Sequence, residues 1–207
     1  MIRLVIVEDH PAIAEALAAL LGAEPDIRVA GIATDAERAE RMIDELAPDV
    51  VLCDVMLDGR DAGFDLVQHA GNRSRFLMLT AYDYQSYHVR AIRVGAAGYL
   101  SKMSDAKTIA ATIRRIHAGH RGFSIDVLRS ASQAPTPPTR REMQLLELLS
   151  EGSTNDEIAS ALGIRAKTVE GMLRRLFDRY AVDNRTQLAR YAARQGWLHS
   201  WVPGPTG

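Results

Sequence analysis

Short apolar runs alternate with helical patterns over the first 122 residues of the chain. Each run is bounded by polar or turn-forming residues, as expected for strands buried on both faces of a parallel sheet. This alternation predicts a doubly wound α/β domain, with a five-stranded parallel sheet covered by helices on both sides. The predicted strands cover residues 3–8, 28–33, 49–54, 75–80 and 96–101.

The segments between these runs carry apolar residues at helical spacing. The predicted helices of this part cover residues 11–24, 35–47, 64–71, 84–95 and 105–119. In the first helix one apolar face is expected to pack on the sheet. That face consists of Ile13, Ala16, Leu17, Leu20 and Leu21.

A small, polar and proline-rich stretch, SASQAPTPPT at residues 130–139, shows no apolar periodicity and is typical of a linker. Beyond it the pattern is helical only, with short turns. Thr154 followed by Glu157 predicts a capping box, and Gly163 separates two short helices in a helix-turn-helix pattern. The sequence therefore predicts a small all-α domain of four helices. The predicted boundaries are 1–122 for the α/β domain, 123–137 for the linker, 138–198 for the helical domain and 199–207 for a tail.

The chain of 207 residues has a length that suits two small domains. Residues 1–137 carry 15 Lys/Arg and 18 Asp/Glu, and residues 138–207 carry 10 and 8, so their formal charges are −3 and +2. The mild positive charge of the second part permits nucleic-acid binding. The single cysteine, Cys53, excludes an intrachain disulfide and fits a reducing cytoplasm. No membrane span and no signal peptide is expected.

Residues that carry chemistry follow four of the predicted strands. Glu8 ends the first and Asp9 follows it, Asp54 ends the third, Thr80 ends the fourth, and Lys102 follows the fifth. Because the carboxyl ends of parallel strands meet at one edge of the sheet, these side chains are expected to converge. Three close carboxylates stay ionised near neutral pH only if a cation shares them, and their oxygens suit Mg²⁺.

In such a pocket Asp54 is a carboxylate nucleophile that can attack a phosphorus atom, with the metal held by Glu8 and Asp9. The metal, the Lys102 ammonium and the Thr80 hydroxyl would stabilise negative charge on the transferred group. The sequence thus predicts that Asp54 accepts a phosphoryl group.

The motifs VIVEDHPAIAEAL, LMLTAYD and GYLSK, with the aspartate that ends the third strand, resemble a bacterial two-component receiver domain. The resemblance covers residues 1 to about 122 and implies a flavodoxin-like fold. It gives the five pocket residues above the roles of acidic pair, phosphoacceptor, switch hydroxyl and invariant lysine. It also implies that Tyr99 is the switch aromatic and that the backbone carbonyl of Met56 is a further metal ligand.

One loop departs from the receiver pattern. Asp58 stands where the family commonly has proline, and Ala62 is an extra residue before Gly63. We therefore expect a longer, more acidic and more flexible loop over the pocket, which would alter phosphorylation and dephosphorylation rates. Asp61 and Asp65 are expected to be solvated acids at the start of a helix, where negative charge is favourable.

The segment from Thr139 to Val182 resembles the DNA-binding domain of the NarL/LuxR (FixJ) family, over residues 138–198. The resemblance implies that the helix beginning near Ala166 lies in the major groove. The buried stripe of this helix is expected to be Val169, Leu173, Leu176 and Tyr180. The residues expected to contact DNA are Lys167, Thr168, Glu170, Gly171, Arg174 and Arg175.

Three positions of this helix differ from the family. Glu170 and Met172 stand where the family often has lysine and histidine. Glu170 could accept from a cytosine amino group, but we expect it to pair with Arg174 four residues on. Arg165 replaces the usual serine cap, so the helix start is expected to be less firmly set.

Together the resemblances predict a two-domain response regulator. A sensor histidine kinase would phosphorylate Asp54, and a homodimer would then bind double-stranded promoter DNA. One alternative is a phosphatase that uses Asp54 as nucleophile and Asp58 or Asp61 as the acid, but the chain offers no substrate cap. The other is an atypical receiver controlled by a protein partner, which the complete pocket argues against and the altered loop favours.

Overall fold

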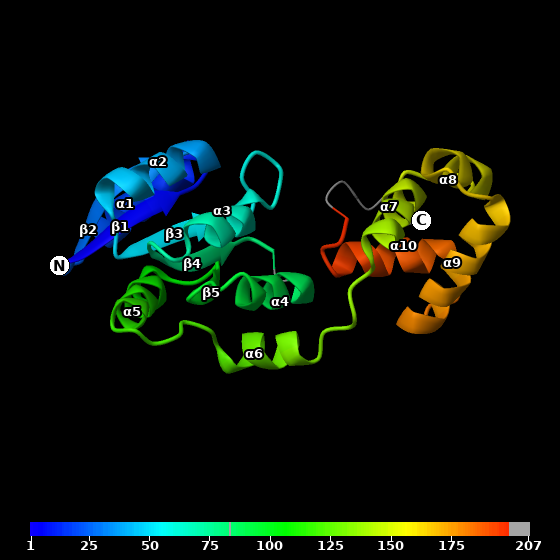
Figure 1. The fold of residues 1–207 in the computed structure, drawn as a ribbon. Helices are drawn as coiled ribbons and strands as arrows, with labels where there is room; N and C mark the ends of the chain where they lie inside the picture. Colours follow the sequence, from blue (N-terminus) through cyan, green and yellow to red (C-terminus); the bar gives the residue numbers. More distant parts are fainter. Residues whose placement is uncertain (83, 199–207) are drawn as a thin grey trace. The chain divides into compact units, whose positions relative to one another are not determined.

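A computed structural model describes residues 1–82 and 84–198 of the chain (Figure 1). The chain divides into two compact units, and the linker passes from one to the other between Ser132 and Gln133. The predicted tail, residues 199–207, lies outside the described residues. Within the described ranges, no helix has the length and apolar character needed to cross a membrane.

The first unit contains a five-stranded, fully parallel sheet with the strand order β2-β1-β3-β4-β5, which confirms the predicted fold class. Val7 pairs with Cys53, and Asp54 pairs with Leu79, so the residues that follow β1, β3 and β4 lie at one edge of the sheet. The strands are β1 (Ile2–Val7), β2 (Ile27–Ala33), β3 (Val50–Asp54), β4 (Arg75–Thr80) and β5 (Gly98–Ser101).

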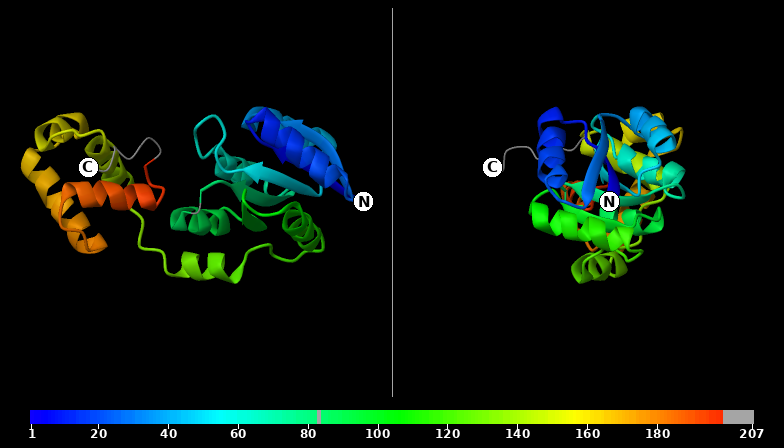
Figure 2. Two further views of the ribbon diagram at one scale, coloured as in Figure 1. Left: turned by 180° about the vertical axis from the view of Figure 1, so that it is seen from behind. Right: turned by 90° about the vertical axis from the view of Figure 1, so that its left-hand side faces the viewer.

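Helices cover both faces of this sheet. α1 and α5 pack together on one face, and α2 and α3 pack together on the other (Figure 2). α4 lies beside α3, where the rings of Phe64 and Tyr87 meet edge to face with their centroids 5.4 Å apart. The helices of this unit are α1 (Pro11–Gly22), α2 (Ala36–Leu46), α3 (Ala62–Ala70), α4 (Gln85–Arg93), α5 (Ala106–His117) and α6 (Ile125–Ser132).

The prediction for the buried face of α1 is wrong in part. Ala14 and Leu21 are buried, whereas Ile13 and Leu20 are 38% and 54% exposed, and Ala16 is also exposed. Nearly every residue of this helix is apolar, so several faces satisfy a helical period equally well. The close approach to the sheet instead selects the face on which the small side chain of Ala14 lies.

Part of the predicted linker is helical. α6 occupies residues 125–132 and belongs to the first unit, so the irregular connection is shorter than the predicted 123–137. α6 buries none of its residues, and Ile125 is 74% exposed. A short helix of this kind carries a weak apolar pattern, which explains why the sequence analysis did not find it.

The second unit is a bundle of four helices, as predicted. Its core gathers apolar side chains from all four helices, including Leu145, Ile158, Leu176 and Leu188. The Thr154 capping box is present, and a second one joins Thr139 to Glu142. Gly163 ends the second helix in the left-handed region with φ +63°, which favours glycine. The helices are α7 (Arg140–Ser150), α8 (Asn155–Leu162), α9 (Ala166–Tyr180) and α10 (Arg185–Arg194).

Candidate functional site

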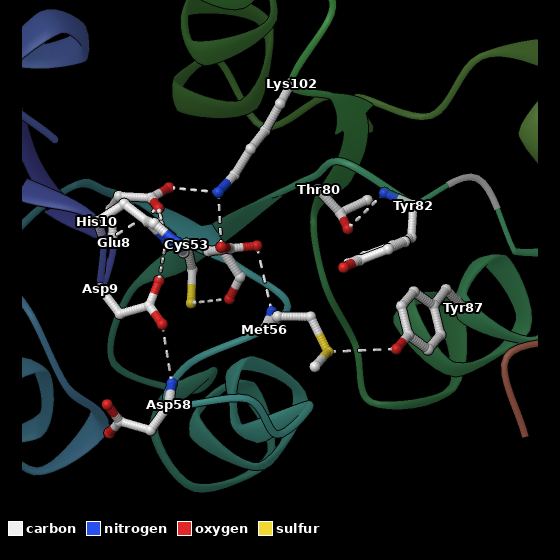
Figure 3. A network of polar contacts seen from close by, with 11 residues as sticks. Glu8, Asp9, His10, Cys53, Met56, Asp58, Thr80, Tyr82, Tyr87 and Lys102 are labelled. Carbon is white, nitrogen blue, oxygen red and sulfur yellow. Dashed lines mark hydrogen bonds and ion pairs between the residues drawn. The ribbon is translucent and has the colours of Figure 1, made fainter. Parts of the chain in front are cut away.

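The strand ends bring the predicted pocket residues together at one edge of the sheet (Figure 3). Asp54 is the last residue of β3 and Glu8 follows β1, and these side chains are only 4% and 1% exposed. Lys102 follows β5, and its backbone amide donates to the Thr80 carbonyl at 2.7 Å. The pocket is therefore a product of the parallel topology, because each residue takes its place from the strand that precedes it.

The Lys102 ammonium joins the two buried carboxylates. Its Nζ lies 2.6 Å from Glu8 Oε2 and 2.6 Å from Asp54 Oδ2. Burial raises the pKa of Asp54, and Lys102 opposes that shift. Burial would lower the pKa of Lys102, but its hydrogen bonds with Asp54 and Glu8 outweigh this effect and raise that pKa. The lysine therefore stays charged and partly compensates the carboxylates.

The remaining carboxylate oxygens are held by backbone amides of the next loop. Asp54 Oδ1 accepts from the Met56 amide at 3.1 Å, and Asp9 Oδ2 accepts from the Asp58 amide at 3.0 Å. Asp9 is 16% exposed at its side chain, so this part of the pocket opens to solvent. Three carboxylates with a solvent opening fit a hard divalent cation that retains some of its waters.

His10 is a pocket residue that the sequence analysis missed. Its Nδ1 lies 2.7 Å from Asp9 Oδ1 and 3.3 Å from Glu8 Oε1. The hydrogen bond and the charge of Asp9 raise the pKa of His10 above its ordinary value. Its position directly after two acids was the available signal. Because His10 is exposed, its charge is screened by solvent.

The two predicted switch residues are connected through the backbone of Tyr82. Thr80 is 1% exposed, and its Oγ1 accepts from the Tyr82 amide at 3.1 Å. The Tyr99 hydroxyl donates to the Tyr82 carbonyl at 2.9 Å, and Tyr99 is 3% exposed. A change at the Thr80 hydroxyl would therefore reach Tyr99 through one residue.

Part of the altered loop, residues 57–60, forms a tight turn. Asp58 and Gly59 have φ of +52° and +70°, and the flanking Leu57 and Arg60 exchange two backbone hydrogen bonds of 2.7 and 3.1 Å. This is the geometry of a type I′ turn, for which an Asp-Gly pair is the local sequence signal. The hydrogen bond from Asp58 to Asp9 then ties the turn to the pocket.

Arg90 of α4 binds the start of α3, which is a second contact that the sequence did not predict. Its guanidinium pairs with Asp61, and with Asp65 at 2.9 Å, and its Cζ lies 4.7 Å from the centroid of the Phe64 ring. Asp61 occupies the cap position of α3 without a side-chain cap bond. The two acids expected to be solvated thus connect α3 to α4.

The recognition helix predicted in the second unit corresponds to α9. Its expected stripe, Val169, Leu173, Leu176 and Tyr180, is buried as predicted. The residues Lys167, Thr168, Glu170, Arg174 and Arg175 are exposed. Gly171 is half-buried, and a Cβ added there would meet nothing within 4 Å. The exposed side of α9 therefore carries basic and polar side chains around Gly171, which has no side chain.

The residues of α9 and its cap that differ from the family pattern have different roles in the structure. Met172 is 6% exposed and packs in the core, so it is a packing residue. The expected pair between Glu170 and Arg174 is not formed, since no ion pair joins them in the described part of the chain. Exposed pairs of this kind gain only a few tenths of a kcal/mol. Arg165 provides no side-chain cap, in agreement with the prediction.

An ion pair between the buried Glu142 of α7 and the partly exposed Arg179 of α9 was also missed. Arg179 donates two hydrogen bonds of 3.0 Å to Glu142, which is 7% exposed. Burial would raise the pKa of Glu142, but the hydrogen bonds from Arg179 and Thr139 lower it below its ordinary value. Glu142 therefore serves both the capping box and the packing of α9 on α7.

Comparison with known families matches both units. Residues 4–114 match the family described as "Response regulator receiver domain", and residues 138–192 match "Bacterial regulatory proteins, luxR family". These matches confirm the two resemblances drawn from the sequence motifs.

Individual proteins resemble the chain over nearly its whole length. The transcriptional regulatory protein LiaR of Bacillus subtilis is 35% identical over 206 residues, covering 94% of this chain and 98% of that protein. The transcriptional regulatory protein DesR of the same species is 29% identical, covering 96% and 100%. The solved structure of the response regulator ChrA, from a heme-sensing two-component system, is 28% identical with a TM-score of 0.56, covering 95% and 98%.

Proposed function

This chain belongs to the response regulators in which a receiver domain precedes a luxR-type DNA-binding domain, and from that premise we propose that phosphorylation of Asp54 controls its binding to promoter DNA. The family consists of DNA-binding transcription regulators, not enzymes, so the phosphatase alternative is set aside. The proposal concerns the phosphoacceptor, the kinase, the metal and the dimer.

In the proposed step a carboxylate oxygen of Asp54 attacks the phosphorus of a phosphohistidine on a sensor kinase. The new O–P bond forms as the N–P bond breaks, and the released imidazole nitrogen takes up a proton. Lys102 lies where it can follow the phosphoryl oxygens, and the Thr80 hydroxyl can donate to one of them. The site residues for Mg²⁺ are Glu8, Asp9, Asp54 and the Met56 carbonyl. When bound, the ion supplies positive charge to the transferred group.

One observation carries this proposal, namely the pairing of a single lysine with two buried carboxylates. Lys102 Nζ lies 2.6 Å from both Glu8 and Asp54, whose side chains are 1% and 4% exposed. Isolated buried carboxylates are costly, and a purely structural role would be served better by apolar side chains. A reactive role explains why the fold retains them.

The test is the mass of the intact protein after incubation with Mg²⁺ and acetyl phosphate. We expect one phosphoryl adduct on the wild-type chain and none on Asp54→Asn. Asp58→Asn serves as the matched control, since it alters an exposed aspartate of the adjacent turn, and it should keep the adduct. A folded wild-type protein without an adduct, also after incubation with cognate kinases, would favour the partner-controlled receiver.

We further propose that phosphorylation promotes a homodimer that binds double-stranded DNA in the cytoplasm. Two copies of α9 would then read two half-sites related by a dyad. Lys167, Thr168, Glu170, Gly171, Arg174 and Arg175 form the proposed contact surface. Fluorescence anisotropy at fixed salt, together with sedimentation velocity, would measure both steps on phosphorylated and unmodified protein. The proposed dimerisation and DNA binding would be contradicted if phosphorylated and unmodified protein had the same DNA affinity and the same molecular mass in solution.

A further inference from the structure

We propose that His88 is a positioning residue that couples the Tyr99 switch to the docking of α6, the last helix before the chain enters the second unit. This inference rests on the proposed function for its trigger, phosphorylation of Asp54. Its physical basis is a continuous series of contacts inside the first unit, from the pocket to α6.

The series begins with the backbone of Tyr82. Its amide donates to Thr80 Oγ1 at 3.1 Å, and its carbonyl accepts from the Tyr99 hydroxyl at 2.9 Å. The Tyr99 ring then meets the His88 ring edge to face, with centroids 4.9 Å apart and an interplanar angle of 85°. His88 Nδ1 lies 2.9 Å from the Ser130 hydroxyl of α6. Four contacts therefore connect the switch hydroxyl to α6.

The position of His88 suits a coupling role. It lies on α4 and is only 5% exposed, so its ring is held by its surroundings. A polar ring in such a site is retained at a cost, because it must be hydrogen-bonded when buried. Packing alone would be satisfied by an apolar residue. The histidine offers both a ring face for Tyr99 and a polar atom for Ser130.

α6 is only lightly packed on the first unit. It buries none of its residues, and Ser130 belongs to a half-buried face with Val127 and Ala131. The chain before α6 is anchored, because Gly122 is buried and bridges to Gly98 of β5. α6 is thus fixed at its start and held near its end by the His88 contact. α6 runs alongside α4 in Figure 1.

The proposed switch has two states. In the state described here Tyr99 is bound to Tyr82 and α6 is docked through His88. When Thr80 turns its hydroxyl to a phosphoryl group on Asp54, the Tyr82 amide loses its acceptor. Tyr99 and His88 then adopt another arrangement, the bond to Ser130 breaks, and α6 leaves α4. The phosphoryl group shifts the populations because it binds only one arrangement of Thr80.

Amide hydrogen exchange of residues 125–132 in the full chain tests the docked state without any phosphate. Ser130→Ala should raise exchange in α6 about three- to tenfold, the range expected for one lost hydrogen bond. Ser130→Thr keeps the hydroxyl and should restore wild-type exchange. Ser132→Ala is the matched control, since that hydroxyl bonds the Arg129 carbonyl within the same helix. Unchanged exchange in Ser130→Ala would overturn the proposal.

Two further arms test the coupling. Tyr99→Leu should also raise exchange in α6, although residue 99 lies outside that helix, and no change would contradict the role of His88. The wild-type chain should show the same rise after phosphorylation, with the adduct confirmed by mass in the same sample. An adduct without a change in α6 would refute this inference alone. Absence of an adduct would refute the proposed function. The exchange experiment on Ser130→Ala would still show whether the His88–Ser130 contact docks α6.

Discussion

Asp54, the proposed phosphoacceptor, illustrates how a buried charge is held at a cost. Burial raises the pKa of this carboxylate and disfavours its charged form, and Lys102 compensates only part of the effect. A group whose pKa is raised by folding stabilises the folded state where it is protonated and loses that contribution as the pH rises. At neutral pH, therefore, the pocket holds a negative charge that weakens the first unit.

Because the buried charge of Asp54 is unfavourable, we expect Asp54→Asn to stabilise the first unit. The neutral amide has nearly the same shape and carries no buried charge, so we expect the free energy of unfolding to increase at neutral pH. The gain should shrink at lower pH, where the wild-type carboxylate takes up a proton. Exchange of the slowest amides of β1 and β3 reports unfolding of this unit. A loss of stability at neutral pH would show that Lys102 overcompensates the burial.

The double backbone contact of the Asp58–Gly59 turn is another residue-scale feature. The left-handed geometry of this turn needs residues that tolerate positive φ, and the backbone amide of Asp58 donates a hydrogen bond to Asp9. The turn therefore orients a proposed metal ligand. The carboxylate of Asp58 points away from the pocket in Figure 3.

At the scale of elements, α9 separates a packing side from a contact side. The buried stripe is set by helical periodicity, and the exposed side carries Arg174, Arg175 and Lys167. Gly171 is unusual on such a helix because it lowers helix stability without any neighbour that requires its small size. Its retention is explained if the backbone there approaches DNA.

Gly171→Ala tests this explanation. The added methyl group meets no protein atom within 4 Å, so the free energy of unfolding of the second unit should rise by about 0.5–1 kcal/mol. DNA affinity should nevertheless fall, as measured by anisotropy at fixed salt. Arg38→Ala on α2 of the first unit controls for salt-dependent effects of net charge, and Arg174→Ala should weaken binding with a smaller salt slope. Unchanged affinity in Gly171→Ala would place DNA elsewhere.

At the scale of the whole molecule, one buried carboxyl group in each unit responds to pH, and the two respond in opposite directions. In the first unit the raised pKa of Asp54 makes protonation favourable to the fold. In the second unit the hydrogen bonds from Arg179 and Thr139 lower the pKa of Glu142 despite its burial. That contribution is fully present above the ordinary pKa of 4.5 and is lost as the pH falls through the lowered folded value.

We therefore expect acid to weaken the second unit through Glu142. Glu142→Gln should reduce its free energy of unfolding at neutral pH by about 1–3 kcal/mol, the usual range for a hydrogen bond to a charged group. Below pH 4.5 the variant and the wild type should converge, because the wild-type carboxylate becomes protonated. Hydrogen exchange in α7 and α9 across this pH range provides the measurement. Parallel pH profiles would show that the charge of Glu142 does not stabilise the second unit.

The local pattern of the chain was sufficient for the strands, for every helix except α6, and for the convergence of the acidic pocket residues. Apolar runs and helical spacing depend on near neighbours in the sequence, and parallel strands place their final residues at a common edge. For this reason Glu8, Asp54, Thr80 and Lys102 could be assigned before their distances were known. The stripe of α9 followed from the same reasoning, because its polar and apolar positions differ clearly.

Contacts between distant segments settled the remaining features. The buried face of α1 depended on the space above the sheet, since its sequence is apolar nearly all round. Asp61 binds Arg90 and His88 binds Ser130, over separations of 29 and 42 residues. A local sequence pattern cannot predict pairs so far apart. Periodicity shows which side of an element is buried. Specific polar contacts instead require the geometry that packing creates, and in this protein they join α3 to α4 and α4 to α6.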